Sequence, residues 1–225
     1  YNFDQIIDRR QSDSIKWRSF PPDVIPLYAA DMDFPSPPAV AAALHARVEH
    51  GFFGYPVESE ELRQLFAERL GRLYGWHVPP EAVLFAPRIA EGVLLSCRAI
   101  AAGSDLLLPT PIYSFVRVLT DAGYNCLHAP MAMRADGHAA FDFDRLEAAC
   151  TPRTRLLFLC NPHNPVGRAY TEPELRQLAE FCIRRRITII SDEVYSDLVF
   201  SGARHIPIAS LDESVAAHTF TIMGP

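Results

Sequence analysis

The chain has 225 residues, of which 49% are hydrophobic and 21% are charged, and its net charge is -6. That length accommodates one large α/β domain, or one and a half domains, with the composition of an ordinary globular protein. The mild negative charge excludes the strong positive field of nucleic-acid binders, so we expect no nucleic-acid partner.

The spacing of cysteine and histidine indicates neither a metal centre nor a disulfide framework. The five cysteines include no C-x-x-C pair, which favours free thiols in a reducing cytoplasm. The eight histidines show no H-E-x-x-H motif, so we expect no metal site. No apolar run is as long as a membrane span and no signal-peptide pattern opens the chain. We therefore expect a soluble, cytoplasmic protein without a membrane partner.

The first 35 residues are expected to be irregular, because four prolines interrupt them. Ser36 is expected to cap a helix that has Pro37 at its first position and runs to about His50. A second amphipathic helix is expected from about Ser59 to Tyr74. The chain thus opens with an irregular segment and two helices.

Short apolar runs and helical patterns then alternate along the chain. The apolar runs are predicted to be strands, at 82–86, 105–108, 124–128, 155–160, 187–191 and 219–223. Helices are predicted between most of them, at 90–101, 113–122, 143–149 and 172–185, the last with a capping box from Thr171 to Glu174. Alternation at this spacing predicts an α/β fold of three layers, with a mostly parallel sheet between two layers of helices.

The segment from Ile187 to Tyr195 carries the strongest chemical signal. A run of β-branched residues ends in Asp192, and the phenol of Tyr195 follows three positions later. A carboxylate at the carboxyl end of a strand lies where open α/β sheets bind their ligands. It suits a cationic ring nitrogen, such as the pyridinium of pyridoxal 5′-phosphate (PLP).

A rigid loop follows the neighbouring predicted strand. Its sequence, Asn161-Pro162-His163-Asn164-Pro165-Val166-Gly167, contains two X-Pro bonds and a glycine. Taken alone, such a loop is equally well explained as a plain turn between a strand and a helix. Because Asn164 and Asp192 both follow carboxyl ends of strands, their polar groups are expected to converge on one ligand.

Together, the 161–167 loop and Ser-Asp-Glu-Val-Tyr at 191–195 resemble the fold-type I PLP enzymes of the class I/II aminotransferase superfamily. Residues 3–10, 13–17, 30–35 and 205–207 also look like the MalY/PatB-type cystathionine β-lyase branch of that superfamily. The resemblance implies a division into residues 1–35, an N-terminal arm and small-domain segment, and residues 36–225, a PLP-binding large domain that is partial.

The resemblance implies specific roles at the cofactor ring. Asp192 would pair with the protonated pyridine nitrogen and keep the ring an electron sink. Asn164 and Tyr195 would donate hydrogen bonds to the phenolic oxygen of the cofactor, and Tyr113 would stack on the ring. Asp192 and Tyr195 are thus the catalytic candidates.

The cofactor phosphate has a second set of candidates. A helix that begins near Ile89 and Ala90 presents unpaired N–H groups that suit a phosphate. The resemblance implies that Tyr55 reaches the phosphate of a neighbouring subunit, and hence that the protein is a homodimer with a shared active site. Arg88 stands where the family usually has a small residue; it either adds a phosphate contact or points to solvent.

Three other groups of residues are interpreted as structural. Asp31 and Asp33 look like a D-x-D metal pair, but the prolines around them favour a turn. Glu193 follows Asp192 directly and is expected to point the opposite way, toward a structural partner. Lys16, the only lysine, lies in the N-terminal arm, whereas the family's Schiff-base lysine lies downstream of the acid-bearing strand.

The Schiff-base lysine is expected just after Pro225. In the family, a strand that ends in a small residue and proline leads into a Ser-Lys pair, and the chain ends with Gly224 and Pro225. We therefore expect an incomplete chain, which lacks the C-terminal small domain and the arginine that holds the substrate carboxylate.

Three hypotheses for the function follow. The first is a PLP-dependent carbon–sulfur β-lyase that converts cystathionine or a cysteine conjugate into a thiol, pyruvate and ammonia. The second is an aminotransferase; Tyr195 favours it, because the lyase branch often has histidine at that position. The third is a non-catalytic regulatory protein on the same fold, supported only by the missing lysine. The first two require a small amino-acid substrate.

Overall fold

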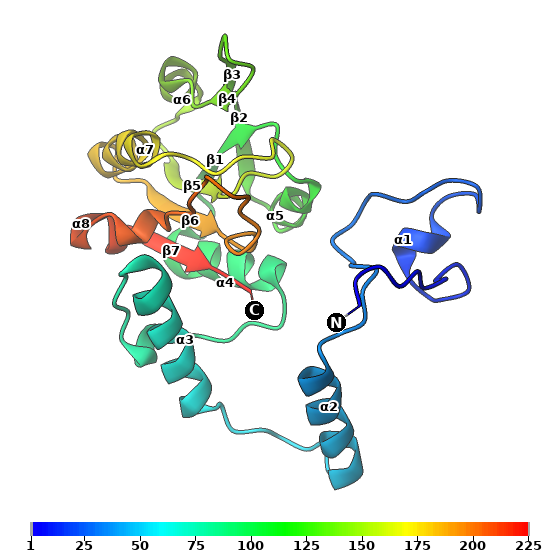
Figure 1. Cartoon of the computed structure of the whole chain (residues 1–225). Helices are drawn as coiled ribbons and strands as arrows, with labels where there is room; N and C mark the ends of the chain where they lie inside the picture. Colours follow the sequence, from blue (N-terminus) through cyan, green and yellow to red (C-terminus); the bar gives the residue numbers. More distant parts are fainter. Residues whose placement is uncertain (1, 225) are drawn as a thin grey trace. The chain divides into compact units, whose positions relative to one another are not determined.

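The computed structural model describes residues 2–224, apart from the side chain of Phe115. The chain forms two compact units, Tyr1–Glu58 and Ser59–Pro225. The second unit contains the sheet, and its strands and helices are shown in Figure 1.

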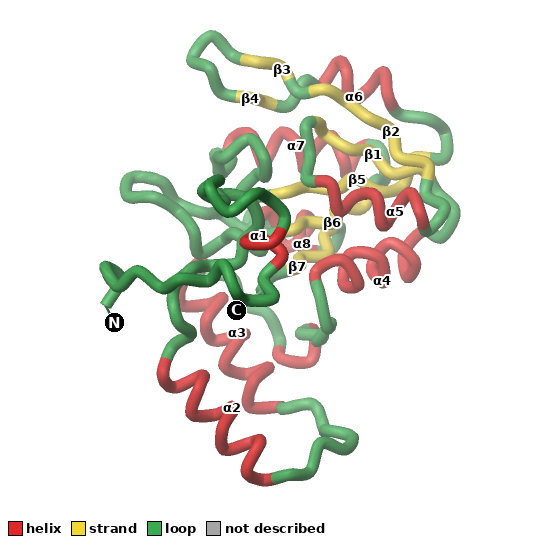
Figure 2. The backbone as a smooth tube through the Cα atoms, turned by 90° about the vertical axis from the view of Figure 1, so that its right-hand side faces the viewer, coloured by secondary structure: helices red, strands yellow, loops and turns green. Residues whose placement is uncertain are grey.

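The sheet of the second unit has five parallel strands in the order β2-β1-β5-β6-β7. The strands are β1 (Asp105–Thr110), β2 (Asn125–Pro130), β5 (Thr154–Cys160), β6 (Thr188–Asp192) and β7 (Thr219–Ile222). A separate antiparallel hairpin of β3 (Ala132–Met133) and β4 (Ala139–Ala140) follows β2 and extends at the top of Figure 2.

Helices lie on both faces of this sheet (Figures 1 and 2). The unit begins with α3 (Glu60–Tyr74) and a 3₁₀ turn at Pro80–Ala82. Its later helices are α4 (Ile89–Ala101), α5 (Arg117–Asp121), α6 (Phe143–Ala149), α7 (Glu172–Arg184) and α8 (Glu213–Ala216), with 3₁₀ turns at Ser114–Val116 and Ile208–Ser210.

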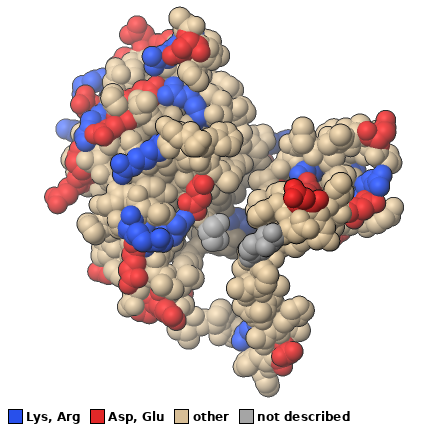
Figure 3. Space-filling model, viewed as in Figure 1, with Lys and Arg blue, Asp and Glu red and all other residues tan. Residues whose placement is uncertain are grey.

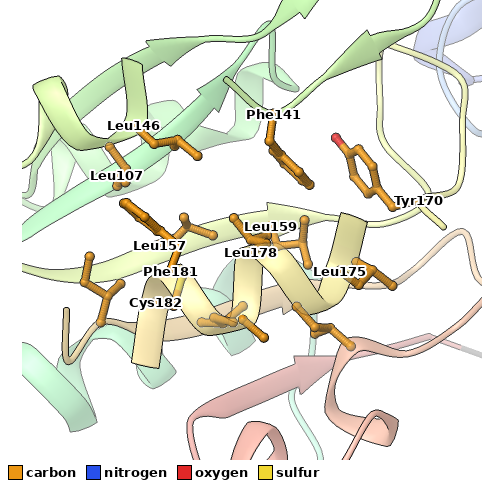
Figure 4. Packing of buried hydrophobic residues seen from close by; sticks show 14 of the residues in the cluster. Leu107, Phe141, Leu146, Leu157, Leu159, Tyr170, Leu175, Leu178, Phe181 and Cys182 are labelled. Carbon is orange, nitrogen blue, oxygen red and sulfur yellow. The ribbon is translucent and has the colours of Figure 1, made fainter. Parts of the chain in front are cut away.

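Alternate side chains of each strand enter two separate hydrophobic cores. On β5, Leu157 and Leu159 pack with α6 and α7, whereas Leu156 and Phe158 pack with α4 and α5. Figure 4 shows the first core, in which α7 lies along the sheet. Because the side chains of a strand alternate between faces, a run of apolar residues fills both cores at once. The three-layer α/β fold with a mostly parallel sheet is confirmed.

The first unit is held by charge rather than by a large apolar core. It contains α1 (Ile15–Arg18) and α2 (Pro38–His50). The Lys16 ammonium is 2.6 Å from the Asp33 carboxylate and donates to the Asp31 carbonyl oxygen at 2.9 Å. Arg9 forms ion pairs with both acids at 2.8 Å. These contacts hold the pKa of Asp33 down, to about 2, chiefly through the hydrogen bond from Lys16.

Most predicted elements are present, with small shifts at their ends. The helix that begins the large predicted domain is capped by Pro37, so that Pro38, not Pro37, is its first residue. The Glu174 carboxylate accepts the backbone N–H of Thr171 at 2.9 Å, as the capping box predicts. The helix predicted at 113–122 is a 3₁₀ turn followed by the short α5.

The predicted strand at 82–86 is wrong. Residues 80–82 form a 3₁₀ turn, and Val83 has an extended backbone without pairing to any strand among the described residues. A strand requires a hydrogen-bonding neighbour, which an apolar run by itself does not supply. The predicted domain boundary after residue 35 stays a prediction, although the compact units meet after Glu58.

Candidate active site

The sheet order creates a topological switch point between β1 and β5. The chain runs from β1 outward to β2, and later from β5 in the opposite direction to β6 and β7. The connection after β1 therefore leads toward one edge of the sheet, and the connection after β5 leads toward the other edge. The carboxyl ends of such a strand pair border a crevice, which is the usual ligand site of open α/β sheets. The loops that begin at Pro111 and Asn161 leave the sheet at this edge.

Asp192 is the last residue of β6, opposite Cys160 of β5 and Ile222 of β7. Its residue is 5% exposed, and its carboxylate accepts the Val194 N–H at 3.2 Å. Burial raises the pKa of Asp192 to about 6, and the charge of Glu193 adds to that rise. No cation is paired with Asp192 among the described residues, so this acid is suited to a cationic group of a ligand.

The 161–167 loop is anchored against the end of β6. The Asn161 N–H donates to the Asp192 carbonyl oxygen at 2.9 Å. The Asn164 N–H donates to the sulfur of Cys160 at 3.4 Å. Gly167 has a left-handed backbone (φ 75°) and returns its N–H to the His163 carbonyl oxygen at 2.7 Å. This tight turn places Asn164 beside the strand pair that ends in Cys160 and Asp192.

The two candidate tyrosines come from different strand ends. Tyr195 follows β6 and is partly buried; burial raises its pKa, and the charges of Tyr113, Cys160 and Asp192 contribute to that rise. Tyr113 follows β1 and Tyr195 follows β6, and because these strands are parallel, both tyrosines leave the sheet at the edge where Asp192 lies. Tyr113 itself is 51% exposed. The cluster therefore has a buried acid at its base and phenols nearer the surface.

The amino end of α4 supplies the candidate phosphate site. The first helical hydrogen bond there joins the Gly92 N–H to the Arg88 carbonyl oxygen, so the N–H groups of Ile89 and Ala90 have no partner within the helix. The Arg88 side chain is largely exposed and pairs with Glu91 in the first turn of α4. That ion pair lowers the pKa of Glu91. The structure thus directs Arg88 to Glu91 at the surface.

Three further predictions can be placed. Glu193 is fully buried and accepts from Ser191 Oγ at 2.8 Å, from His205 Nε2 at 2.7 Å and from the Ile208 N–H at 3.2 Å. Its structural role is confirmed. Asp31 and Asp33 contact the side chains of Arg9 and Lys16 within the first unit. Tyr55 belongs to that unit and is fully exposed; its contact with a cofactor stays a prediction.

Two residues of this region were missed at the level of sequence. The thiol of Cys160 donates to the Pro162 carbonyl oxygen at 3.4 Å, and burial raises its pKa to about 12, which makes it a structural thiol. The imidazole of His163 is buried and contacts both Pro111 and Tyr170. The sequence did contain a signal for His163, because it lies inside a rigid loop at the end of a strand. A side chain at such a position can anchor the loop to its neighbours.

In the described part of the chain, no helix combines the length and the apolar character that crossing a membrane demands. Within the same residues, no three His, Cys, Asp or Glu side chains gather so as to hold a metal ion. On the face of the second unit seen in Figure 3, basic and acidic side chains are interspersed. That face therefore presents no field of a single sign.

Comparison with known proteins agrees with this geometry. The chain is 34% identical to cystathionine beta-lyase PatB of Bacillus subtilis over 232 residues, which cover 100% of this chain and 60% of PatB. The PLP-bound C–S lyase from Staphylococcus hominis superposes with a TM-score of 0.89 at 29% identity, over 99% of this chain and 58% of that one. N-succinyldiaminopimelate aminotransferase from Mycobacterium tuberculosis superposes with a TM-score of 0.78 at 34% identity, over 85% of this chain and 51% of that one.

The chain thus spans about 60% of the length of PatB. The family model described as aminotransferase class I and II matches residues 22–224, which include part of the first compact unit, nearly all of the second and every candidate site residue. The chain belongs to the aminotransferase class I and II family.

Proposed function

We propose that the switch point between β1 and β5 is a PLP site in which Asp192 pairs with the pyridine nitrogen. The observation that carries this proposal is the environment of Asp192, a buried carboxylate without a cationic partner among the described residues. A pyridinium N–H would supply both the charge and the donor that this carboxylate lacks. PLP-bound relatives support the same choice of cofactor.

The other candidates fit the remaining parts of the cofactor. PLP, when bound, supplies an electron sink for a bond broken at the α-carbon of an amino acid. Asn164 and Tyr195 would donate to its phenolic oxygen, and the ring of Tyr113 would cover its face. The N–H groups of Ile89 and Ala90 would bind its phosphate at the positive end of α4. Asp192 would hold the ring nitrogen protonated.

We infer that the reaction is carbon–sulfur β-elimination from cystathionine or a cysteine conjugate. The Cα proton is removed, the Cβ–S bond breaks, the sulfur leaves as a thiol, and hydrolysis of the remaining fragment gives pyruvate and ammonia. The similarity to PatB and to the C–S lyase supports this reaction class. Lys16 is not suited to the role of the Schiff-base lysine, because Asp33 and Asp31 hold its ammonium in the first unit.

The test uses the protein expressed from its complete reading frame and loaded with PLP. Pyruvate release from cystathionine is measured without any keto acid, and the Asp192→Asn variant serves as the control for the site. Release that depends on PLP and on Asp192 supports the lyase. If no pyruvate forms under these conditions, the lyase proposal is refuted.

The aminotransferase remains the second candidate function. Two observations favour it: Tyr195 stands where the lyase branch often has histidine, and an aminotransferase is among the solved structures with the same fold. In the same assay, transfer of the amino group to 2-oxoglutarate without pyruvate release would select the aminotransferase over the lyase.

We also infer a homodimer with a shared active site. Val40, Leu44 and Val48 lie four residues apart on α2 and are all exposed, as is Tyr55. Residues spaced by four form one stripe along a helix, and an exposed apolar stripe is typical of an interface. A second copy of the chain is the partner that the predicted role of Tyr55 requires.

We place the protein in the cytoplasm. All five of its cysteines are free, and three of them are buried. Free thiols are typical of proteins kept in a reducing compartment. Fractionation of cells that produce the tagged protein would test the assignment, with recovery outside the cytoplasm as the opposing result.

A further inference from the structure

The buried side chain of His163 connects the two loops that leave the sheet at the switch point. His163 is 2% exposed. Nε2 lies 2.8 Å from the carbonyl oxygen of Pro111, which follows β1 directly. Nδ1 lies 2.6 Å from the hydroxyl of Tyr170, which follows the 161–167 loop. One imidazole therefore joins segments that are 52 positions apart in the chain.

These two partners determine which nitrogen carries the proton. A carbonyl oxygen can only accept, so Nε2 must be the donor to Pro111. Nδ1 is then the acceptor of a neutral imidazole, and the Tyr170 hydroxyl donates to it at 2.6 Å in preference to the Met131 sulfur at 3.8 Å. Burial lowers the pKa of His163, and the charge of Arg168 lowers it further, which favours this neutral form. The Nε2–H tautomer satisfies both contacts at once.

The Tyr170 end of this connection is fixed in the core. The ring of Tyr170 is stacked on Phe141 with 4.4 Å between centroids, as Figure 4 illustrates. The Tyr170 N–H donates to the side-chain oxygen of Asn161 at 3.2 Å. Arg168 lies over the same ring at 5.1 Å. Tyr170, fixed in the core, thus holds the imidazole through Nδ1. The Nε2–H of the same ring can then position the more exposed segment after β1.

The segment after β1, from Pro111 to Tyr113, lies near the surface, where a hydrogen bond to a buried side chain can fix its position. Tyr113, two residues beyond Pro111, is 51% exposed, so burial alone does not determine its place. The Thr110 carbonyl oxygen accepts the Met131 N–H at 2.8 Å, which fixes the end of the strand but not the residues beyond it. The bond to His163 is the next contact along the backbone. Asn164 is adjacent to His163, so the same anchor sets the separation of Tyr113 from Asn164.

We propose that His163 is a positioning residue whose Nε2–H holds the exit of β1, and with it Tyr113, in register with Asn164 across the switch point. This inference rests on the proposed PLP site for its functional meaning. The ring of Tyr113 and the amide of Asn164 would contact different parts of one flat cofactor, so their separation matters for affinity.

Two substitutions of His163 distinguish the contact made by Nε2 from the contact made by Nδ1. The amide nitrogen of His163→Gln reaches the position of Nε2 and can still donate to Pro111. The amide oxygen of His163→Asn reaches only the position of Nδ1 and can accept from Tyr170 but cannot contact Pro111. Tyr170→Phe removes the hydroxyl and leaves the Pro111 bond in place. Melting temperatures of all three variants are measured first.

Amide hydrogen exchange of residues 112–116 in the cofactor-free protein is the main readout. His163→Asn is expected to raise exchange there by roughly ten-fold, the effect of losing one hydrogen bond, while His163→Gln stays within about three-fold of wild type. PLP affinity, measured by equilibrium dialysis, should fall in the same order. If both variants exchange like wild type, or both equally faster, the proposal is overturned.

A measurement on the wild-type protein decides the matter if the variants do not fold. Nitrogen-15 NMR of the His163 side chain should show the neutral Nε2–H tautomer at neutral pH. An unprotonated Nε2 would contradict the proposal, because it could not donate to the Pro111 carbonyl oxygen. If the wild-type protein binds no PLP at all, the proposed function fails, but the exchange and NMR results still decide whether His163 anchors the exit of β1.

Discussion

Asp192 and Glu193 are neighbours in the chain, yet the Glu193 carboxylate has three hydrogen-bond donors and the Asp192 carboxylate has one among the described residues. The Glu193 carboxylate accepts hydrogen bonds from Ser191, His205 and Ile208, whereas the Asp192 carboxylate accepts only from the Val194 N–H among the described residues. Both are buried. Because side chains at the end of a strand alternate between faces, Glu193 braces the structure while Asp192 is left for a ligand.

The first prediction concerns the pH dependence of stability in the cofactor-free protein. The pKa of Asp192 is raised from 3.8 to about 6 in the folded state. The folded protein therefore holds a proton that the unfolded chain releases between these pH values, and stability falls as the pH rises through them. The rise of the pKa from 3.8 to about 6 corresponds to roughly 3 kcal/mol.

Asp192→Asn removes this ionisation and keeps an acceptor for the Val194 N–H. The variant should equal wild type at acidic pH and become the more stable protein, by up to about 3 kcal/mol, once the pH exceeds the folded-state pKa. Urea denaturation across this range measures the difference. A constant difference at every pH would show that the Asp192 carboxyl does not titrate as described.

The second prediction concerns Glu193. Glu193→Ala leaves three buried donors without an acceptor, on Ser191, His205 and Ile208, and should lower the free energy of unfolding by roughly 3–5 kcal/mol. Glu147→Ala is the matched control, because that half-exposed acid pairs with Arg184 and Arg185 at the surface; its loss should cost at most about 1 kcal/mol. Equal costs for the two variants would contradict the bracing role.

The third prediction separates the two tyrosines of the site. Tyr195→Phe removes the hydroxyl that is proposed to donate to the cofactor, and PLP affinity should fall by roughly ten-fold. Tyr113→Phe keeps the ring that stacking requires and should bind PLP within about three-fold of wild type. Equilibrium dialysis of both variants measures the difference. A larger loss for Tyr113→Phe would reverse the proposed roles.

The fourth prediction concerns the dimer. Leu44→Glu places a charge in the middle of the exposed stripe of α2, between Val40 and Val48, and should convert the protein to a monomer because burial of an unpaired charge is costly. Arg117→Glu, at the start of α5 in the second unit, is the charge control. Sedimentation velocity gives the molar mass of each variant; an intact Leu44→Glu dimer would exclude this stripe from the interface.

The sheet, and the position of the candidate site residues at one of its edges, were predictable because their signals are local. The apolar runs at 105–108, 155–160 and 187–191 fill both cores, so no periodicity is needed to recognise them. Asp192 ends one of these strands and Asn164 lies in the loop after another, and parallel strands bring their carboxyl ends to one edge. A strand assignment therefore places the polar residues that follow it.

Elements that depend on distant partners were not predictable in the same way. The run at 82–86 is apolar, but nothing in its composition reveals that no described strand pairs with it. The role of His163 depends on Pro111, whose carbonyl oxygen comes near only after the sheet forms. By contrast, the β3–β4 hairpin had a local signal that was missed: Asp136-Gly137, where Gly137 takes φ 81° in the turn.

We propose above that Asp192 keeps the nitrogen of a bound pyridine ring protonated. Nitrogen-15 NMR of PLP labelled at that nitrogen, bound to the protein from its complete reading frame, tests it most directly. A protonated nitrogen in wild type and an unprotonated one in Asp192→Asn, under mildly alkaline conditions, is the predicted result. The same protonation state in both proteins would exclude this role for Asp192.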